Sequence, residues 1–319
     1  MSRRKVLFTR PLPDAILARA DDMFDLTVRA SNAPMTGAEM RAALALYDGI
    51  MPTLGDAFSA AIFAEFGRPR CRILANFGVG TNHIDVAAAR AHGVGVTNTP
   101  GAVTDATADI AMTLLLMSAR RAGEGERLVR AGLWEGWHPT QMLGLHASGK
   151  TVGIVGMGRI GQAIARRCHF GFGMQVAFFN RSPRTPDFPA RQIATLTELA
   201  SMVDFLVVAT PGGAETRHLI SAEVLAAMRP HARLINISRG DVVDETALID
   251  ALQSGRIGGA GLDVYEHEPH VPEALRALET VVLLPHMGTS AEEVRIGMGE
   301  MVLDNLAAFF AGETPPNLV

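Results

Sequence analysis

Arg239, Glu268 and His286 lie far apart in the chain, yet each follows a short apolar run typical of a buried β-strand. The carboxyl ends of parallel strands meet at one edge of a sheet, where open α/β folds bind their ligands. A guanidinium suits a carboxylate ligand, and an imidazole beside a carboxylate side chain suits proton transfer. Any one of these residues alone would more often be structural. Together they make a chemically complete set of side chains in one crevice.

A glycine-rich turn at residues 156–161 is the second chemical feature. Gly156, Gly158 and Gly161 have the spacing GxGxxG, after the β-prone run 151–155 and before a helical pattern. In this context the first glycine permits a tight turn, the second lets the backbone approach a pyrophosphate, and the third lets helix and strand pack closely. The helix N-terminus offers N–H groups and partial positive charge to the phosphates. We therefore predict a dinucleotide site.

The end of the next predicted strand, 175–179, bears on the choice of dinucleotide. An NAD site usually carries Asp or Glu there for the ribose 2′-hydroxyl, whereas an NADP site omits that charge and adds Arg. Here the strand is followed by Asn180, Arg181 and Ser182, with no acid. This pattern favours NADPH over NADH, although NADH use stays open.

Short apolar runs alternate with helical patterns along most of the chain, which predicts α/β architecture with parallel sheets. A first group of predicted strands is 5–9, 25–29, 49–51, 72–76 and 95–97. A second group is 151–155, 175–179, 205–209, 233–237, 259–262 and 281–284. The strongly apolar helix 105–121 is expected to be buried. The last helix, 291–311, is expected to return to the first domain.

The stretch 123–145 is predicted to be irregular and carries both tryptophans, Trp134 and Trp137. Two exposed indoles on one loop would be costly. A core-packing role is favoured, and a substrate lid or a contact between subunits is the alternative.

The composition excludes several protein classes. The 319 residues are 48% hydrophobic and 19% charged, which suits two ordinary domains. With a net charge of −4 and no long basic run, we expect no nucleic-acid partner. We expect no signal peptide and no membrane segment, and Cys71 and Cys168 have neither metal-ligand nor disulfide spacing. Two buried free thiols in a reducing cytoplasm are therefore expected.

Together these motifs resemble the D-isomer-specific 2-hydroxyacid dehydrogenase family, most closely its NADP-dependent glyoxylate/hydroxypyruvate reductases. The resemblance covers nearly the whole chain. The matching stretches are 76–85, 103–109, 153–161, 235–244, 261–269 and 284–290.

The resemblance implies two doubly wound parallel-sheet α/β domains, with a Rossmann-type cofactor domain inserted into a flavodoxin-like substrate domain. The expected substrate domain is 1–100 plus 286–319, and the expected dinucleotide-binding domain is 101–285. Family members are commonly homodimers joined through their cofactor domains. Trp137 is then the residue expected to reach the neighbouring active site.

The family's chemistry implies a role for each of the three separated residues. Arg239 would bind the carboxylate and 2-oxo group of a small 2-oxo acid, with the N–H groups of Val79 and Gly80. His286 would protonate the carbonyl oxygen as hydride arrives, and Glu268 would orient His286 and keep it protonated.

The resemblance also implies cofactor contacts at many positions. Asp263 would accept from the nicotinamide carboxamide, and Thr107 would lie beside the ring. The full expected set is Thr107, Gly156, Gly158, Arg159, Ile160, Gly161, Asn180, Arg181, Ser182, Thr210, Pro211, Ile237, Asp263 and His286. The turn Thr210-Pro211-Gly212-Gly213 departs from the family's usual Pro-Leu-Thr-like sequence.

Other functions on the same fold stay open. Oxidation of phosphite or of another D-2-hydroxy acid is compatible with the motifs. Formate is disfavoured because formate enzymes carry Gln in place of Glu268, and phosphoglycerate is disfavoured by the lack of visible phosphate-binding arginines and of an appended regulatory domain. A cofactor-gated binding protein, like the corepressors that resemble this family, is the alternative from another class.

Overall fold

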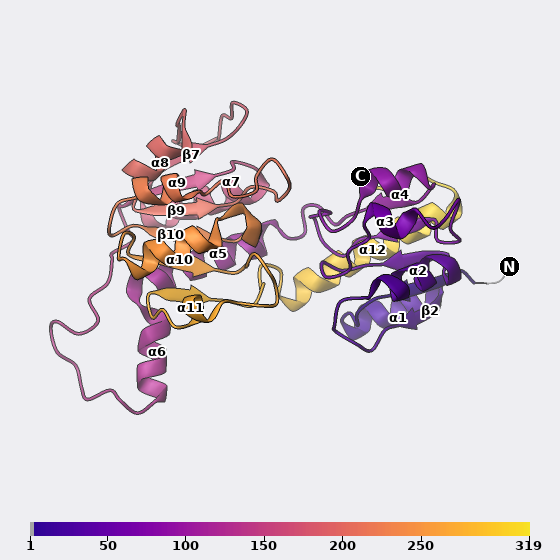
Figure 1. The fold of residues 1–319 in the computed structure, drawn as a ribbon, viewed down its shortest axis with the longest axis horizontal. Helices are drawn as coiled ribbons and strands as arrows, with labels where there is room; N and C mark the ends of the chain where they lie inside the picture. The colour runs from indigo at the N-terminus through magenta and orange to yellow at the C-terminus, as the bar shows by residue number, and fades with distance from the viewer. Residues whose placement is uncertain (1–2) are drawn as a thin grey trace. The chain divides into compact units, whose positions relative to one another are not determined.

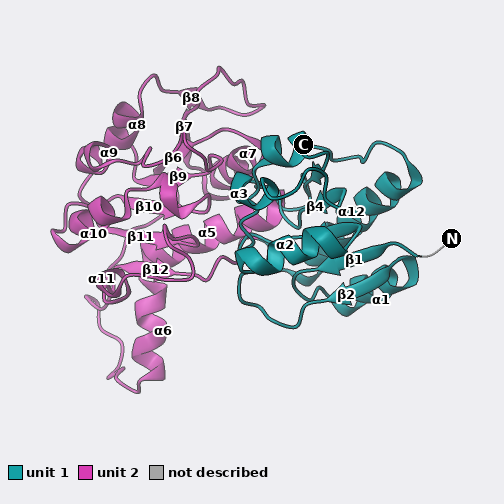
Figure 2. Cartoon of the chain, turned by 45° about the vertical axis from the view of Figure 1, so that its right-hand side comes forward, with its two compact units in different colours: residues 1–103, 289–319 teal, residues 104–288 magenta. Residues whose placement is uncertain are grey.

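The structure is a computed structural model that describes residues 3–319. It contains two compact units, coloured separately in Figure 2. Unit 1 comprises the chain up to Val103 together with Thr289–Val319, and unit 2 comprises Thr104–Gly288. The boundaries expected from the sequence, after residues 100 and 285, fall three residues before each of these.

Unit 1 is built on a five-stranded parallel sheet with the order β2-β1-β3-β4-β5. This is the flavodoxin-like order, as expected. Apart from the edge strand β2, whose residues are exposed or half-buried, its strands are mostly buried because helices cover both faces of such a sheet. The strands are β1 (Lys5–Phe8), β2 (Asp25–Val28), β3 (Gly49–Met51), β4 (Ile73–Ala75) and β5 (Gly95–Thr97).

The helices of unit 1 come from both ends of the chain. Four of them alternate with the strands, and the last, α12, packs against α1 and β4. They are α1 (Asp14–Met23), α2 (Gly37–Leu46), α3 (Ala60–Phe63), α4 (Val86–Ala91) and α12 (Glu292–Ala311). None of the helices in the described chain is both long and apolar enough to cross a membrane.

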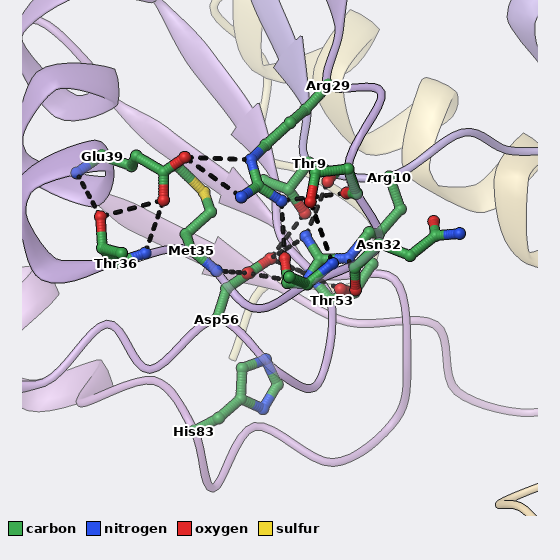
Figure 3. A network of polar contacts seen from close by, with 12 residues as sticks. Thr9, Arg10, Arg29, Asn32, Met35, Thr36, Glu39, Thr53, Asp56 and His83 are labelled. Atoms are coloured by element: carbon green, nitrogen blue, oxygen red, sulfur yellow. Dashed lines mark hydrogen bonds and ion pairs between the residues drawn. The ribbon is translucent and has the colours of Figure 1, made fainter. Parts of the chain in front are cut away.

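A polar network at the carboxyl end of β1 and β3 is drawn in Figure 3. The fully buried carboxylate of Asp56 accepts hydrogen bonds from Thr9 Oγ1 at 2.6 Å, Met35 N at 3.0 Å and Thr53 N at 3.1 Å. It also forms an ion pair with Arg10 at 3.1 Å. A buried charge needs such partners, and here they tie the loops after β1 and β3 together.

Unit 2 contains a seven-stranded parallel sheet with the order β12-β11-β10-β9-β6-β7-β8. The order reverses at β6 and β9, as in a Rossmann-type sheet, and the predicted fold class is confirmed. Only six strands were predicted, because β8 is two exposed residues without an apolar run. The strands are β6 (Thr151–Val155), β7 (Gln175–Phe179), β8 (Arg191–Gln192), β9 (Phe205–Val208), β10 (Arg233–Asn236), β11 (Gly259–Leu262) and β12 (Val281–Leu283).

The helices of unit 2 other than α6 flank this sheet (Figure 1). The apolar helix α5 is largely buried, as expected, and packs against α7, β10 and β11. The helices are α5 (Thr104–Arg120), α6 (Ala122–Arg130), α7 (Arg159–Arg166), α8 (Leu196–Met202), α9 (Ala222–Ala227), α10 (Glu245–Gln253) and α11 (Glu273–Arg276).

The prediction of an irregular stretch at 123–145 was wrong for its first part, because α6 is helical. With two glycines and few apolar residues, its sequence has no clear helical pattern. The helix has ion pairs instead: Arg121 pairs with Glu124 at 2.6 Å, and Arg130 pairs with Glu126 one turn away. Such pairs stabilise an exposed helix. α6 and the following segment project away from the sheet of unit 2 in Figures 1 and 2.

The favoured core-packing role of the two tryptophans is also wrong for this chain. Trp134 is 54% exposed and Trp137 is 80% exposed, on the segment that follows α6. Nothing in the sequence pattern distinguishes an apolar side chain that packs inside its own chain from one presented outward. A substrate lid and a subunit contact remain as the alternatives.

Both cysteines are buried and unpaired, as expected. Burial raises the pKa of the Cys71 thiol to about 12, and it does the same for Cys168. Neither sulfur is therefore a reactive thiolate at neutral pH.

Candidate active site

The glycine turn after β6 has the shape that a dinucleotide pyrophosphate requires. Gly156 adopts φ = 97°, and a Cβ atom there would lie 2.9 Å from the Ala209 carbonyl oxygen. A Cβ atom at Gly161 would overlap the Gly156 carbonyl, so only glycine lets α7 pack this closely on the turn. At Gly158 no atom lies within 4 Å of such a Cβ, which leaves the backbone open to a ligand. With Arg159 beginning α7, these residues fit the cofactor.

The end of β7 carries neutral and basic side chains in a fixed arrangement. Asn180 accepts a hydrogen bond from Met157 N at 3.1 Å and donates to the Ser182 carbonyl at 2.8 Å. Asn180 thereby joins the strand end to the glycine turn. Arg181 is exposed and pairs with Glu215, a partner in a distant loop that the sequence did not reveal.

The turn after β9 supports the neighbouring arginine. A Cβ atom at Gly212 would lie 2.6 Å from Arg239 Cγ, so the glycine makes room for that side chain. Thr216 Oγ1 donates to the Pro211 carbonyl at 2.8 Å and closes the loop. The turn Thr210–Gly213, which departs from the usual family sequence, therefore has a glycine at the position where the Arg239 side chain passes closest to it.

Arg239 is held rigidly at the end of β10. Its guanidinium donates to the Ser238 carbonyl at 2.6 Å, and Asn236 Nδ2 donates to the Arg239 carbonyl at 3.0 Å. Ile237, also expected at the cofactor, is buried beside it. Burial lowers the pKa of the guanidinium, while the carboxylates of Glu268 and Asp241 act in the opposite direction. The positive charge of Arg239 therefore interacts with the carboxylate of Glu268.

Glu268 and His286 are hydrogen-bonded partners. Glu268 Oε2 lies 2.8 Å from His286 Nδ1, and Glu268 Oε1 accepts from Tyr265 N at 3.0 Å. Burial alone would raise the pKa of Glu268, but the hydrogen bond and charge of His286, aided by Tyr265 N–H and Arg239, lower it. An ionised carboxylate only accepts, so His286 Nδ1 carries the proton of this bond. Nε2 is then the nitrogen available to a substrate.

Tyr265 is a supporting residue that sequence reasoning missed. Its hydroxyl donates to the Leu284 carbonyl at 2.9 Å, which joins the loop after β11 to the segment just before His286. A Cβ atom at Gly240 would overlap the Tyr265 backbone, so the loop after β10 packs directly on the same residue. The three loops that carry Arg239, Glu268 and His286 thus meet at Tyr265.

The turn that carries His286 is fixed by Asp263. His286 has φ = 53°, a left-handed conformation that a non-glycine residue adopts only when its surroundings impose it. His286 N donates to the Asp263 carbonyl at 2.9 Å, and the Asp263 carboxylate accepts from Met287 N at 2.6 Å and Gly288 N at 2.8 Å. Thr107 Oγ1 donates to the Gly288 carbonyl at 3.1 Å. Burial raises the pKa of Asp263.

In unit 1, the loop after β4 has the form of a small anion site. Asn76 Nδ2 donates to the Gly78 and Gly80 carbonyls, both at 3.0 Å, and Asn98 Nδ2 donates to the Val79 carbonyl at 2.9 Å. These three carbonyls therefore have donors. The N–H groups of Val79 and Gly80, by contrast, have no acceptor among the described residues. Successive backbone N–H groups of this kind bind anions.

A comparison with protein families decides the identity of the chain. Residues 112–288 match the family described as D-isomer specific 2-hydroxyacid dehydrogenase, NAD binding domain. The chain belongs to this family. It is therefore an oxidoreductase, a 2-hydroxyacid dehydrogenase with a nicotinamide cofactor, as the sequence predicted.

Individual relatives of this dehydrogenase match over nearly its whole length. It is 42% identical to a glyoxylate reductase of Thermococcus kodakarensis, covering 99% of this chain and 96% of that protein. It is 35% identical to a glycerate dehydrogenase of Hyphomicrobium methylovorum, covering 98% of each. An NADPH-dependent glyoxylate/hydroxypyruvate reductase of Sinorhizobium meliloti, solved with NADP and malonate, has a TM-score of 0.86 at 40% identity, covering 100% of this chain and 97% of that one.

Proposed function

We propose that this dehydrogenase reduces small 2-oxo acids, glyoxylate and hydroxypyruvate first, with NADPH as the reductant. The observation that carries the proposal is the 2.8 Å contact between Glu268 Oε2 and His286 Nδ1, with Arg239 close enough to shift the pKa of the same carboxylate. Relatives named glyoxylate reductase and glycerate dehydrogenase support it.

In the proposed reaction, NADPH supplies the hydride that the carbonyl carbon accepts. Arg239 binds the substrate carboxylate and 2-oxo group through its guanidinium, and the N–H groups of Val79 and Gly80 bind the carboxylate. His286 donates the proton on Nε2 to the carbonyl oxygen. The Glu268 carboxylate stabilises the imidazolium before the transfer and fixes the plane of its ring.

The cofactor is proposed to lie along the carboxyl edge of the sheet in unit 2. The backbone of Gly156, Gly158, Arg159, Ile160 and Gly161 would hold the pyrophosphate. Thr210, Pro211 and Ile237 would line the cofactor, Asp263 would accept from the nicotinamide carboxamide, and Thr107 would lie beside the ring. Asp263 has further acceptor capacity for the carboxamide beyond its two backbone hydrogen bonds.

NADPH is preferred over NADH in this proposal because the end of β7 has no carboxylate to repel a 2′-phosphate. Asn180, Arg181 and Ser182 supply donors and a positive charge instead. Arg181 would exchange its exposed ion pair with Glu215 for the phosphate. Exposed pairs of this type are weak, so the exchange costs little.

We further propose that a second copy of the chain covers the α6 segment. This segment exposes several large apolar side chains, which isolated soluble chains rarely present together. They are Val129, Leu133, Trp134, Trp137 and Leu143. Trp137 is the residue proposed to reach the partner's substrate site. A reducing cytoplasm is the proposed compartment, since both thiols are buried and unpaired.

The test is NADPH oxidation with glyoxylate, hydroxypyruvate, pyruvate and phenylpyruvate, repeated with NADH. Saturable rates highest for the first two acids, and higher with NADPH, are expected. Phosphite-dependent reduction of NADP without 2-oxo acid reduction would favour the phosphite alternative. Tight NADPH binding with negligible turnover of every acid would favour a cofactor-gated binding protein.

A further inference from the structure

Asn76 occupies a central position in the anion loop of unit 1. It directly follows β4, and its side chain is completely buried. One side-chain amide group bridges two carbonyls of the loop, those of Gly78 and Gly80. Because a carbonyl only accepts, both contacts require the Asn76 nitrogen to donate, which fixes the orientation of the amide. Asn76 therefore determines which way the intervening peptide groups face.

His83 in turn fixes Asn76. His83 Nε2 lies 3.0 Å from Asn76 Oδ1. Since the Asn76 nitrogen is committed to the loop carbonyls, Oδ1 accepts, and the proton of this bond belongs to His83 Nε2. A flipped Asn76 would oppose its oxygen to two carbonyl oxygens and its nitrogen to an N–H donor. The imidazole thus supports the amide orientation that holds the loop.

Asn98 holds the middle of the same loop. Its side chain donates to the Val79 carbonyl at 2.9 Å, and Thr99 N donates to the Gly78 carbonyl at 3.1 Å. The backbone of Asn98 is itself held by the C-terminal part of the chain, through Asn305 Nδ2 and the Asn317 carbonyl. The backbone position of Asn98 is therefore set by the C-terminal part of the chain.

We propose that Asn76, His83 and Asn98 are positioning residues for the substrate carboxylate. They bind the carbonyls of Gly78, Val79 and Gly80, which fixes the peptide groups of the loop and leaves the N–H groups of Val79 and Gly80 available to an anion. This proposal rests on the proposed function, in which those N–H groups bind the carboxylate. Preorganised donors bind an anion more tightly because no free energy is spent on ordering the loop.

The test compares His83→Leu, His83→Gln and Asn98→Ala with the unmodified protein. Leu keeps much of the bulk of His83 without a donor, whereas Gln restores an N–H group. We expect His83→Leu and Asn98→Ala to raise the KM for glyoxylate about tenfold, the size of a weakened hydrogen bond to a charged group. kcat at saturation and the KM for NADPH should change less than about threefold, because the loop acts on carboxylate binding alone. His83→Gln should restore most of the substrate affinity.

The same variants are titrated with oxalate in the presence of NADPH, by calorimetry, which needs no turnover. Thr36→Ala, which removes the capping box of α2 in the same unit, is the matched control. It should lower thermal stability and leave oxalate affinity unchanged. Asn76→Ala is omitted because it would take the side-chain donor from the Gly80 carbonyl and at the same time remove the contact with His83.

Unchanged glyoxylate KM and oxalate affinity in both His83→Leu and Asn98→Ala would overturn the proposal. Loss of thermal stability and kcat without a change in either affinity would also overturn it, since that is the effect of a merely structural role. If the unmodified protein binds oxalate but reduces no 2-oxo acid, the proposed function fails, whereas the loop proposal is still decided by the oxalate affinities of the variants.

Discussion

Glu268 Oε2 lies 2.8 Å from His286 Nδ1, although the two residues stand on loops after different strands. The other oxygen of the same carboxylate accepts from Tyr265 N, so the carboxylate cannot rotate without losing a second bond. The imidazole therefore has a fixed plane and a fixed tautomer. Its Nε2 is left as the nitrogen that exchanges a proton with a substrate.

Replacing Glu268 by Gln tests this pair through the pH dependence of the reaction. The lowered pKa of Glu268 means that the carboxylate is charged across the neutral range. Gln removes the negative charge that faces His286 Nδ1, so the kcat/KM profile for glyoxylate reduction should move to lower pH. The profile is measured from initial rates between pH 5 and 9 (about the range that His titration spans).

Glu266→Gln is the control for this shift. Glu266 lies on the same loop but pairs with His218 and Arg217, not with His286. Its replacement should leave the profile in place. An unchanged profile in Glu268→Gln would count against the pair, and an equal shift in both variants would assign the effect to general loop damage.

Arg239→Lys tests the proposed carboxylate anchor. Lysine keeps the positive charge but cannot form two parallel hydrogen bonds to a planar carboxylate. We expect kcat/KM for glyoxylate to fall by about ten- to hundredfold, with NADPH affinity retained. Steady-state kinetics and NADPH fluorescence titration measure the two quantities. Equal losses of substrate turnover and cofactor affinity would contradict the assignment.

The cofactor loop is tested by the double replacement Asn180→Asp and Arg181→Asp. A carboxylate at the end of β7 would accept from the ribose 2′-hydroxyl of NADH and repel the 2′-phosphate of NADPH. The ratio of kcat/KM values for the two cofactors should move toward NADH. An unchanged ratio would refute the assignment of this loop.

Glu215→Gln provides the matched change in the opposite direction. Glu215 is the anion that pairs with Arg181, so its removal leaves the guanidinium to the phosphate. The KM for NADPH should fall while that for NADH stays constant. A parallel change in both values would mean that the pair acts on loop structure alone.

Asp204 provides a stability prediction at the amino end of the sheet in unit 2. Its nearly buried carboxylate accepts from Thr151 N at 2.9 Å and His231 Nε2 at 2.7 Å, with Arg229 also close. Burial alone would raise the pKa of Asp204, but these hydrogen bonds and charges lower it from 3.8. The carboxylate therefore stabilises the fold above that pH, and the contribution is lost as pH falls through the lowered value.

Asp204→Asn should then cost about 1–3 kcal/mol of unfolding free energy at neutral pH, because one bonded acceptor becomes a donor. The difference from the unmodified protein should shrink below pH 3.8. Urea unfolding at several pH values measures it. A constant difference across the acid range would show that the charge of Asp204 contributes nothing.

The sequence predicts both sheets well because their strands are buried on two faces. Runs such as Val152–Val155 and Phe205–Val208 are apolar throughout, and glycines end or begin many of them. The strand ends then locate Arg239 and His286, since position in a parallel sheet dictates which edge a following residue occupies. The pairing of Glu268 with His286 follows from the family's motifs.

Features that depend on partners distant in the sequence were not predictable. Glu215 contacts Arg181 from another loop, and nothing local marks it. Tyr265 reads as an ordinary aromatic core residue until its hydroxyl is seen on Leu284. The exposed helix α6 depends on ion pairs such as Arg121–Glu124 rather than on an apolar stripe, so hydrophobic periodicity did not reveal it.

The most direct test of the central claim is the rate of NADPH oxidation by glyoxylate, measured on the unmodified protein and on His286→Ala with cofactor saturating. The account predicts saturable, glyoxylate-dependent oxidation by the former. The variant should bind NADPH normally and show a kcat lower by about two to four decades, the usual size of a lost general acid. Near-normal turnover by His286→Ala would contradict the account.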